Sequence, residues 1–174
     1  TEIKAKELLG QFDAVCVTIG AGKPRDLNVE GRDLNGIFFA MEFLSAQNKV
    51  LNGELEELSI DLLASGKDVL VIGGGDTGSD CVGTSIRQGA KSVTQIEIMP
   101  KPPIERADEN PWPNYAKILK TTTSHEEGCS RFWSLSTVKF IGDKGKVSGV
   151  EVEEVEWTTS GGKQTMKAVE GSKR

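Results

Sequence analysis

Asp68-Val-Leu-Val-Ile-Gly-Gly-Gly-Asp-Thr-Gly78 is the stretch that decides the fold. Its first part, residues 68–72, is a short apolar run of the kind that forms a buried parallel strand. A helix is expected over 77–88, and Gly89 after it can adopt the left-handed conformation of a helix C-cap. The alternating residues 92–98 predict a second strand. Together they form a βαβ unit, whose crossover is right-handed in nearly all proteins.

The spacing Gly73-x-Gly75-x-x-Gly78 predicts a turn that binds the pyrophosphate of a dinucleotide. Gly73 allows a sharp turn out of the strand, Gly75 lets the backbone approach phosphate, and Gly78 lets the helix pack on the strand. Free N–H groups around Asp76, Thr77 and Gly78 face the phosphates at the positive end of the helix dipole. We therefore predict that these five residues bind the cofactor, although the Asp76 carboxylate itself is expected to cap the helix. A tight turn that binds nothing stays the alternative.

The end of the second strand bears on the choice between NAD and NADP. Glu97 has the spacing of an acid that binds the ribose hydroxyls of NAD, but it is expected inside the strand, between Ile96 and Ile98. Lys101 and Arg106 follow in a proline-rich loop, and such cations stabilise a 2′-phosphate through charge-assisted hydrogen bonds. We therefore predict NADPH as the cofactor, bound by Lys101 and Arg106. The alternative is that both are ordinary solvated loop charges.

Hydrophobic periodicity and turn residues predict further elements on both sides of the βαβ unit. The expected elements are helices over 37–48, 54–64 and 115–120, and strands at 13–19, 136–142, 146–158 and 164–169. The predicted fold class is α/β, a Rossmann-type three-layer domain with a parallel sheet plus an antiparallel hairpin region.

The 174 residues have the composition of an ordinary soluble globular protein, with 37% hydrophobic and 27% charged residues. A net charge of −5 argues against nucleic acid or an anionic membrane as a partner. Three scattered cysteines form no CxxC pair, zinc spacing or iron–sulfur run, so we expect no metal site, and a cytoplasmic location. His125, the single histidine, lies in a polar segment and is expected at the surface. No side chain is predicted to be catalytic.

Several other stretches stand out beside the glycine turn. They are Asp80-Cys-Val-Gly-Thr84, Arg87-Gln-Gly-Ala-Lys-Ser-Val93, Glu97-Ile-Met-Pro-Lys-Pro-Pro103 and Asn110-Pro-Trp-Pro113. With the glycine turn, they resemble the small (beta) subunit of NADPH-dependent glutamate synthase. The resemblance covers most of the chain, from about Asp13 to Trp157.

The resemblance implies an NADPH domain inserted into the chain of an FAD domain. In such subunits NADPH passes a hydride to FAD, and electrons leave through iron–sulfur clusters to the large, glutamate-forming subunit. Residues 1–66 would then be an FAD-domain crossover strand and linker helices, and 67–174 the NAD(P)H-binding Rossmann-like domain. This chain carries neither the FAD fingerprint nor cluster cysteines, so FAD and clusters are expected elsewhere in a larger protein, and the chain alone is expected to be inactive. The alternatives are another two-dinucleotide flavoprotein reductase or a non-catalytic NADPH-sensing module.

Overall fold

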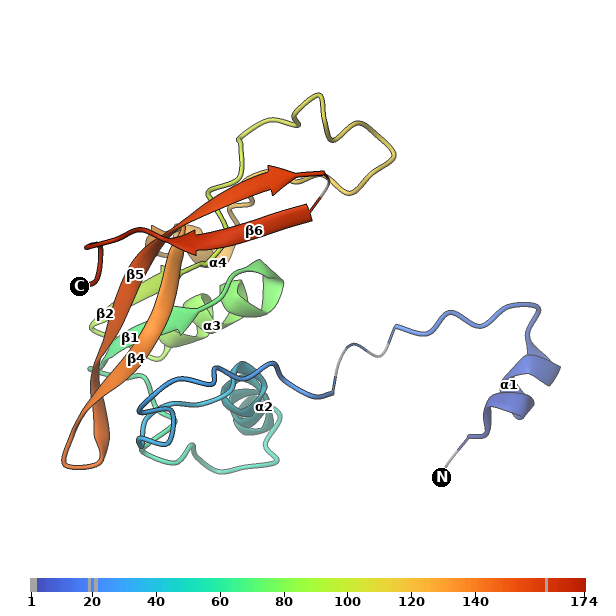
Figure 1. Cartoon of the computed structure of the whole chain (residues 1–174). Coiled ribbons are helices and arrows are strands. Elements are labelled where there is room, and N and C mark those ends of the chain that lie inside the picture. The colour runs from blue at the N-terminus through green and yellow to red at the C-terminus, as the bar shows by residue number, and fades with distance from the viewer. Residues whose placement is uncertain (1–2, 19, 21, 162) are drawn as a thin grey trace.

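A parallel sheet of three strands stands at the centre of the molecule (Figure 1). The computed structural model describes residues 3–18, 20, 22–161 and 163–174. The strands lie in the order β1 (Asp68–Ile72), β2 (Ser92–Ile96) and β3 (Ser130–Phe132). β2 pairs in parallel with both neighbours, so the predicted βαβ unit is confirmed and a third strand extends it.

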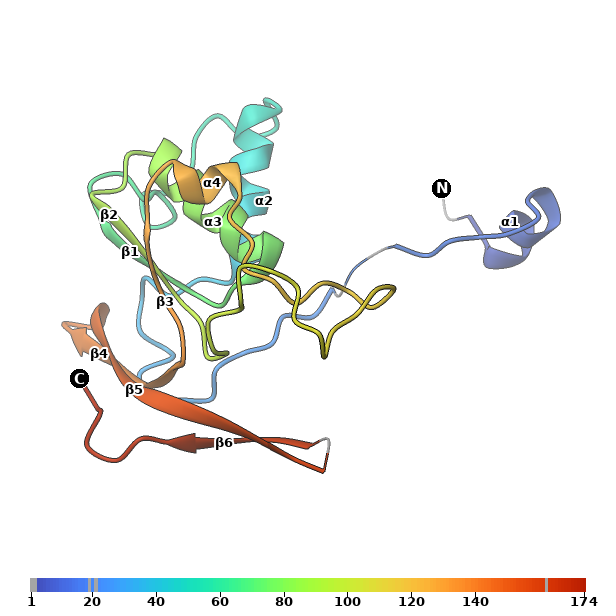
Figure 2. The same cartoon turned by 90° about the horizontal axis from the view of Figure 1, so that it is seen from above.

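Helices cover one face of this sheet (Figure 2). They are α2 (Ala40–Leu51), α3 (Gly75–Arg87) and the short α4 (Thr123–Glu126). α3 is the crossover between β1 and β2, and it contacts both α2 and α4. α1 (Ala5–Gln11) lies away from the rest of the molecule in both views and has no buried residue.

An antiparallel sheet covers the opposite face of the parallel sheet (Figure 2). It consists of β4 (Leu135–Asp143), β5 (Lys146–Ser160) and β6 (Lys163–Ala168), joined as successive hairpins. The layers are thus helices, parallel sheet and antiparallel sheet. This arrangement confirms the predicted α/β class with its antiparallel hairpin region.

Side chains alternate across the parallel sheet and divide the hydrophobic core into two clusters. The cluster that faces the helices comprises Val71, Cys81, Val82 and Val93. The cluster that faces the antiparallel sheet comprises Ile96, Leu135 and Val152. Gln95 follows Val93 by two residues and therefore shares the helix-facing side, where only 1% of it is exposed. A polar side chain is thus built into an apolar layer.

The segment before α2 joins the antiparallel sheet. Glu30 bridges to Lys139 of β4, and Asn35 bridges to Lys146 of β5. Gly31, with a φ of +77°, lies so close to the Phe140 carbonyl that a Cβ atom would clash with it. Part of the N-terminal 66 residues is therefore packed onto the sheets that follow in sequence.

Two predicted elements in the N-terminal part are absent. Residues 13–18 of the predicted strand form irregular chain with exposed side chains and pair with no strand among the described residues, and Ile19 lies outside those residues. A strand needs a neighbour for its backbone N–H and C=O groups, and this segment has none there. The predicted helix over 54–64 is a series of turns and bends. α2 ends just before it, at Asn52 and a left-handed Gly53 with a φ of +73°.

The predicted helix over 115–120 is also absent. The proline loop takes up the backbone donors that a helix would use. Lys117 N–H donates to Asn110 Oδ1 at 2.9 Å, and Leu119 N–H donates to the Pro103 carbonyl at 2.7 Å. In contrast, α4 and β3 form where no element was expected, since runs of four and three residues are too short to carry a periodic pattern. Within the described part of the chain, no helix is both long and apolar enough to cross a bilayer.

Candidate functional site

The glycine turn leaves an open surface at the end of β1. Gly73 and Gly75 have φ values of +108° and +75°, which residues with a Cβ atom rarely adopt. Gly73 N–H donates to the Ile96 carbonyl at 2.8 Å, so the turn is attached to the end of β2. A Cβ atom built on Gly75 would meet nothing within 4 Å. A ligand can therefore approach the backbone of the turn directly.

No side chain among the described residues forms a capping hydrogen bond with the first turn of α3. The helix begins at Gly75, two residues earlier than predicted, and Gly74 is its N-cap. The expected capping by the Asp76 carboxylate is therefore wrong, because Asp76 lies inside the first turn, exposed like Thr77. Since the first N–H groups of a helix have no partner within it, this end can bind an anion such as a pyrophosphate.

Gly78 is buried against the turn that precedes it. A Cβ atom there would lie 2.8 Å from the Gly73 carbonyl oxygen and 2.9 Å from Gln95 Nε2. The close approach expected of this third glycine is thus present. It brings α3 down onto the turn and onto a buried side chain of β2.

Glu97 lies beside the glycine turn, which corrects its expected place inside a strand. β2 ends at Ile96, so Glu97 is the first residue beyond it. Its carboxylate lies so close to Gly74 that a Cβ atom there would overlap it. An Arg131 guanidinium nitrogen is 3.9 Å from the carboxylate, and both side chains are mostly buried, 15% exposed for Arg131 and 20% for Glu97. Glu97 N–H still pairs with the Phe132 carbonyl of β3, and the chain then bends away from the sheet at residues 98 and 99.

The two cations predicted to bind a 2′-phosphate are held differently. Lys101 Nζ lies 5.1 Å from the centre of the Trp133 ring, and the Arg131 guanidinium lies 5.0 Å from the same ring. Lys101 and Arg131 therefore lie against the same ring, and Arg131, which the sequence reasoning missed, is the cation beside Glu97. Arg106 Nη1 instead donates to the carbonyls of Asn110 and Asn114, both at 2.9 Å, and holds the proline loop closed.

His125, expected at the surface, is half-buried and takes part in a network of hydrogen bonds. Its Nε2 lies 3.1 Å from Gln95 Oε1, and its Nδ1 lies 3.1 Å from Thr122 N. Burial and then the charge of Arg131 lower the pKa of His125. Two signals in the sequence could have found it: the three-residue spacing from Thr122 typical of a capping box, and a glutamine at a helix-facing strand position.

The three cysteines offer no redox pair. All are free: Cys16 is exposed, Cys81 is buried and Cys129 is half-buried. Burial, helped by the charge of Asp80, raises the pKa of the Cys81 thiol to about 11. Burial also raises the pKa of Cys129. Because a thiolate is the reactive form, these two thiols are poor nucleophiles at neutral pH.

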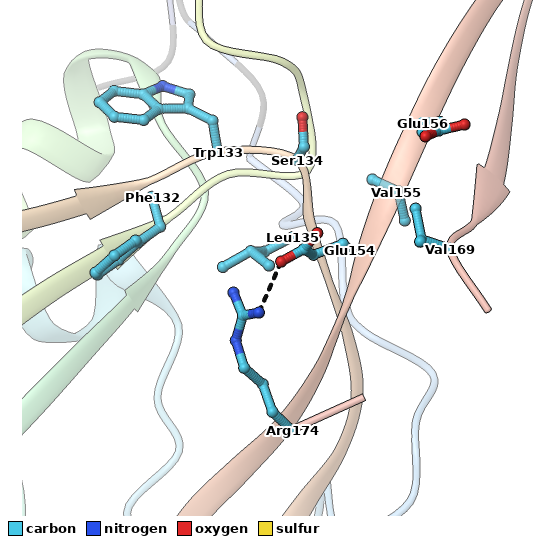
Figure 3. A pocket seen from close by; sticks show the side chains of 9 residues that line it. All are labelled: Phe132, Trp133, Ser134, Leu135, Glu154, Val155, Glu156, Val169 and Arg174. Carbon is cyan, nitrogen blue, oxygen red and sulfur yellow. Dashed lines mark hydrogen bonds and ion pairs between the residues drawn. The ribbon is translucent and has the colours of Figure 1, made fainter. Parts of the chain in front are cut away.

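A separate hollow of about 350 Å³ lies where β3 continues into β4 (Figure 3). Its walls include Phe132, Trp133 and Glu154, and Arg174 donates to the Glu154 carboxylate at 2.7 Å across it. None of the glycine-turn residues lines it. The candidate site is therefore the surface of the glycine turn, bordered by Glu97, and not this hollow.

Comparison with known proteins identifies the family of this chain. The family model described as pyridine nucleotide-disulphide oxidoreductase matches residues 2–161. The small chain of NADPH glutamate synthase from Mycobacterium tuberculosis is 45% identical over 88% of this chain and 32% of that protein. NADH glutamate synthase from Schizosaccharomyces pombe is 43% identical over 98% of this chain and 8% of that protein.

A third relative is the small chain of NADPH glutamate synthase from Bacillus subtilis, 41% identical over 89% of this chain and 33% of that protein. The chain thus spans about a third of the length of these bacterial relatives. Among solved structures, a thioredoxin reductase from Lactococcus lactis matches 84% of this chain and 39% of that chain, with 18% identity and a TM-score of 0.42. The predicted resemblance to glutamate synthase small subunits is confirmed by these identities.

Proposed function

Because the chain belongs to the pyridine nucleotide-disulphide oxidoreductase family, we propose that it binds NADPH at the glycine turn. The observation that carries this proposal is the open backbone at Gly75, where β1 ends and α3 begins. The N–H groups of Gly75, Asp76 and Thr77 would hold the pyrophosphate, Gly73 would shape the turn, and Gly78 would keep α3 close to it. NADPH, when bound, supplies a hydride. The part of this chain is to bind and orient it, which requires no catalytic side chain.

The proposed place of this chain is within a larger flavoprotein that resembles the small subunit of glutamate synthase. There it presents NADPH for hydride transfer to FAD in a separate domain, and electrons pass through iron–sulfur clusters to a large subunit that forms glutamate. The identities with glutamate synthase small chains support this role. Residues 67–174 would form the nucleotide-binding domain, and 1–66 the crossover to the FAD domain. The packing of α2 on α3 would attach that crossover to the nucleotide-binding domain.

The preference for NADPH rests on the cations beyond β2 and β3. Lys101 and Arg131 both lie against Trp133, and Arg131 is also near Glu97 beside the glycine turn. A 2′-phosphate near this pair would gain charge-assisted hydrogen bonds. Arg106 would contribute by holding the proline loop closed, or directly if the loop opens to the ligand.

NADH is the second candidate, favoured by the position of Glu97. An acid at the end of the second strand of such a unit can accept hydrogen bonds from the ribose hydroxyls of NAD and repels a 2′-phosphate. The Glu97 carboxylate lies beside Gly74, which is the appropriate place. The relatives also include one named for NADH and others named for NADPH.

The test of the proposal is a calorimetric titration of the 174-residue chain with NADPH and with NADH. It is repeated with the double variant Lys101→Ala/Arg106→Ala. We expect tighter binding of NADPH and a loss of that preference in the double variant. Lys163→Ala/Lys167→Ala, which removes two exposed lysines from β6, is the matched control and should leave both affinities unchanged.

Equal or tighter binding of NADH by the unaltered chain would make NADH, and not NADPH, the proposed cofactor. Binding of neither nucleotide by a folded chain would overturn the proposed site in this chain. The role in the larger protein is tested by measuring which acceptors the full-length protein reduces. Reduction of a different acceptor would favour another flavoprotein reductase, and binding without any flavin reduction would favour an NADPH-sensing module.

A further inference from the structure

Gln95 is a buried glutamine directly beneath the glycine turn. Its Nε2 donates to the Gly73 carbonyl at 3.0 Å, and its Oε1 faces His125 Nε2 at 3.1 Å. Only 1% of Gln95 is exposed, so no solvent can replace either partner. The orientation of the Gly73 peptide therefore depends on the orientation of this amide.

His125 determines that orientation from the far side. Its Nδ1 accepts the backbone N–H of Thr122, the N-cap of α4, and this requires a lone pair on Nδ1. The remaining proton of a neutral ring is then on Nε2, which donates to Gln95 Oε1. The hydroxyl of Thr122 also contacts Nδ1, and it bonds to the hydroxyl of buried Ser79 on α3.

These contacts form one continuous series of hydrogen bonds from α3 to the glycine turn. It runs from Ser79 through Thr122, His125 and Gln95 to the Gly73 carbonyl. From Thr122 N–H through His125 and Gln95 to the Gly73 carbonyl the donors and acceptors are defined, so a change of protonation at His125 must disturb its neighbours.

Protonation of His125 would break this series of hydrogen bonds at the Nδ1 atom. A proton added at Nδ1 faces the Thr122 N–H, and the acceptor of the capping box is lost. The partners that β2 and α3 supply, Gln95 and Ser79, are uncharged. Burial disfavours the cation most, the charge of Arg131 on β3 adds to this, and together they lower the pKa of the ring.

Glu126 and Glu127 follow the ring directly in sequence, and Glu97 lies beyond the end of β2. Glu127 is paired with Arg87 of α3, and the nearest cation to Glu97 is Arg131. No shift of the His125 pKa arises from any of these acids, and the neutral ring is the form that fits the site.

We propose that Gln95 and neutral His125 are positioning residues for the dinucleotide, which hold the Gly73 peptide in its binding orientation and release it when His125 takes up a proton. The inference rests on the proposed nucleotide site. It adds that nucleotide affinity depends on a ring that lies behind the turn and touches no ligand. Affinity therefore falls as the pH falls through the titration of His125.

Two substitutions test the roles of the two His125 ring nitrogens one at a time. In His125→Gln the side-chain amide nitrogen can take the place of Nε2 and still donate to Gln95, but it does not titrate. In His125→Asn the side-chain oxygen can take the place of Nδ1 and still accept from Thr122, but it does not reach Gln95. The first variant retains positioning without pH dependence, and the second retains the helix cap without positioning.

Binding of NADP⁺, chosen for its stability in acid, is measured by calorimetry from pH 8 to pH 5.5. We expect His125→Gln to bind as the unaltered chain does at pH 8. His125→Asn should bind about fivefold to tenfold more weakly at pH 8, the equivalent of one buried hydrogen bond. The 2′-phosphate itself titrates near pH 6, so the readout is the difference between the unaltered chain and His125→Gln at each pH. That difference should widen as the pH falls through the titration of His125.

A second readout needs neither ligand nor variant. The ¹⁵N and ¹H shifts of Gly73, Gly74 and Gly75 should follow the titration of the His125 ring in an NMR pH series. Titration of the ring without movement of these amides would overturn the inference, as would identical pH profiles for the unaltered chain and His125→Gln. If NADP⁺ did not bind at pH 8, the proposed nucleotide site would fail, while the NMR series would still decide whether His125 controls the turn.

Discussion

The carboxylate of Glu97 lies against the Cα atom of Gly74, in the middle of the glycine turn. Its nearest cation is the Arg131 guanidinium, at 3.9 Å. A negative charge therefore borders the surface where a dinucleotide would sit, and the Arg131 cation lies close to that charge. We therefore expect the charges beside the glycine turn to determine whether the chain prefers NADPH or NADH.

Glu97→Gln should shift the preference of the chain toward NADPH. Removing one charge beside the ribose site should change the ratio of the NADPH and NADH affinities by about tenfold, which corresponds to about 1.4 kcal/mol. Calorimetric titration with each nucleotide measures the ratio. Glu57→Gln, an exposed acid beyond α2, is the control that leaves it unchanged. An unaltered ratio in Glu97→Gln would show that this carboxylate does not face the ribose.

Gly75→Ala should weaken nucleotide binding by more than its effect on folding explains. Its φ of +75° is strained for alanine, at a cost of about 1 kcal/mol, and the new methyl group would occupy the open space over the turn. Gly145→Ala is the matched control, because Gly145 has a φ of +77° and equally open space but lies in the turn between β4 and β5. Chemical unfolding should show similar losses of stability, whereas only Gly75→Ala should reduce affinity. Equal affinities would mean that no ligand approaches Gly75.

Gly83→Ala should destabilise the chain by about 1–3 kcal/mol through overpacking. A Cβ atom at this position would lie 2.6 Å from the Oγ of buried Ser124 and would push α4 away from α3. Urea unfolding followed by circular dichroism measures the cost. Adding Ser124→Gly removes both clashing atoms of that residue and should restore part of the loss. A double variant no more stable than Gly83→Ala would place the strain elsewhere.

The stability of the chain should fall in acid because of His125. Its pKa is lowered in the folded state, so the unfolded chain binds the proton more readily than the folded chain does. The contribution to the free energy of unfolding is complete above the ordinary histidine value of about 6.5 and is lost as the pH falls through the lower, folded value. Urea midpoints between pH 8 and pH 5 measure it, and His125→Gln should show a smaller decline. A decline of the same size in both would assign the effect to other groups.

Cys81 should resist alkylation while Cys16 reacts. The Cys81 thiol is buried and its pKa is raised to about 11, whereas Cys16 is exposed in the irregular N-terminal segment. Labelling with iodoacetamide at pH 8, followed by peptide mass spectrometry, compares the two within one molecule. In urea, where burial is lost, both should react. Rapid labelling of Cys81 in the folded chain would contradict its place in the core between α3 and the sheet.

The sequence by itself determined the βαβ unit and its glycine turn. A short apolar run, three glycines at fixed spacing and an amphipathic helix act locally, so neighbouring residues contain the whole signal. The hairpins of β4, β5 and β6 were equally predictable, because turn glycines and alternating strands are also local.

Only the tertiary structure decided what surrounds the turn. The predicted strand at 13–19 depended on a partner strand, and residues 13–18 have none in the described structure. Glu97, Arg131 and His125 gather near the turn because β2 and β3 lie side by side, and this neighbourhood joins residues that are distant along the chain. A hydrogen bond such as that between His125 and Gln95 leaves no periodic pattern, since it depends on the packing of one segment against another rather than on the spacing of residues within either.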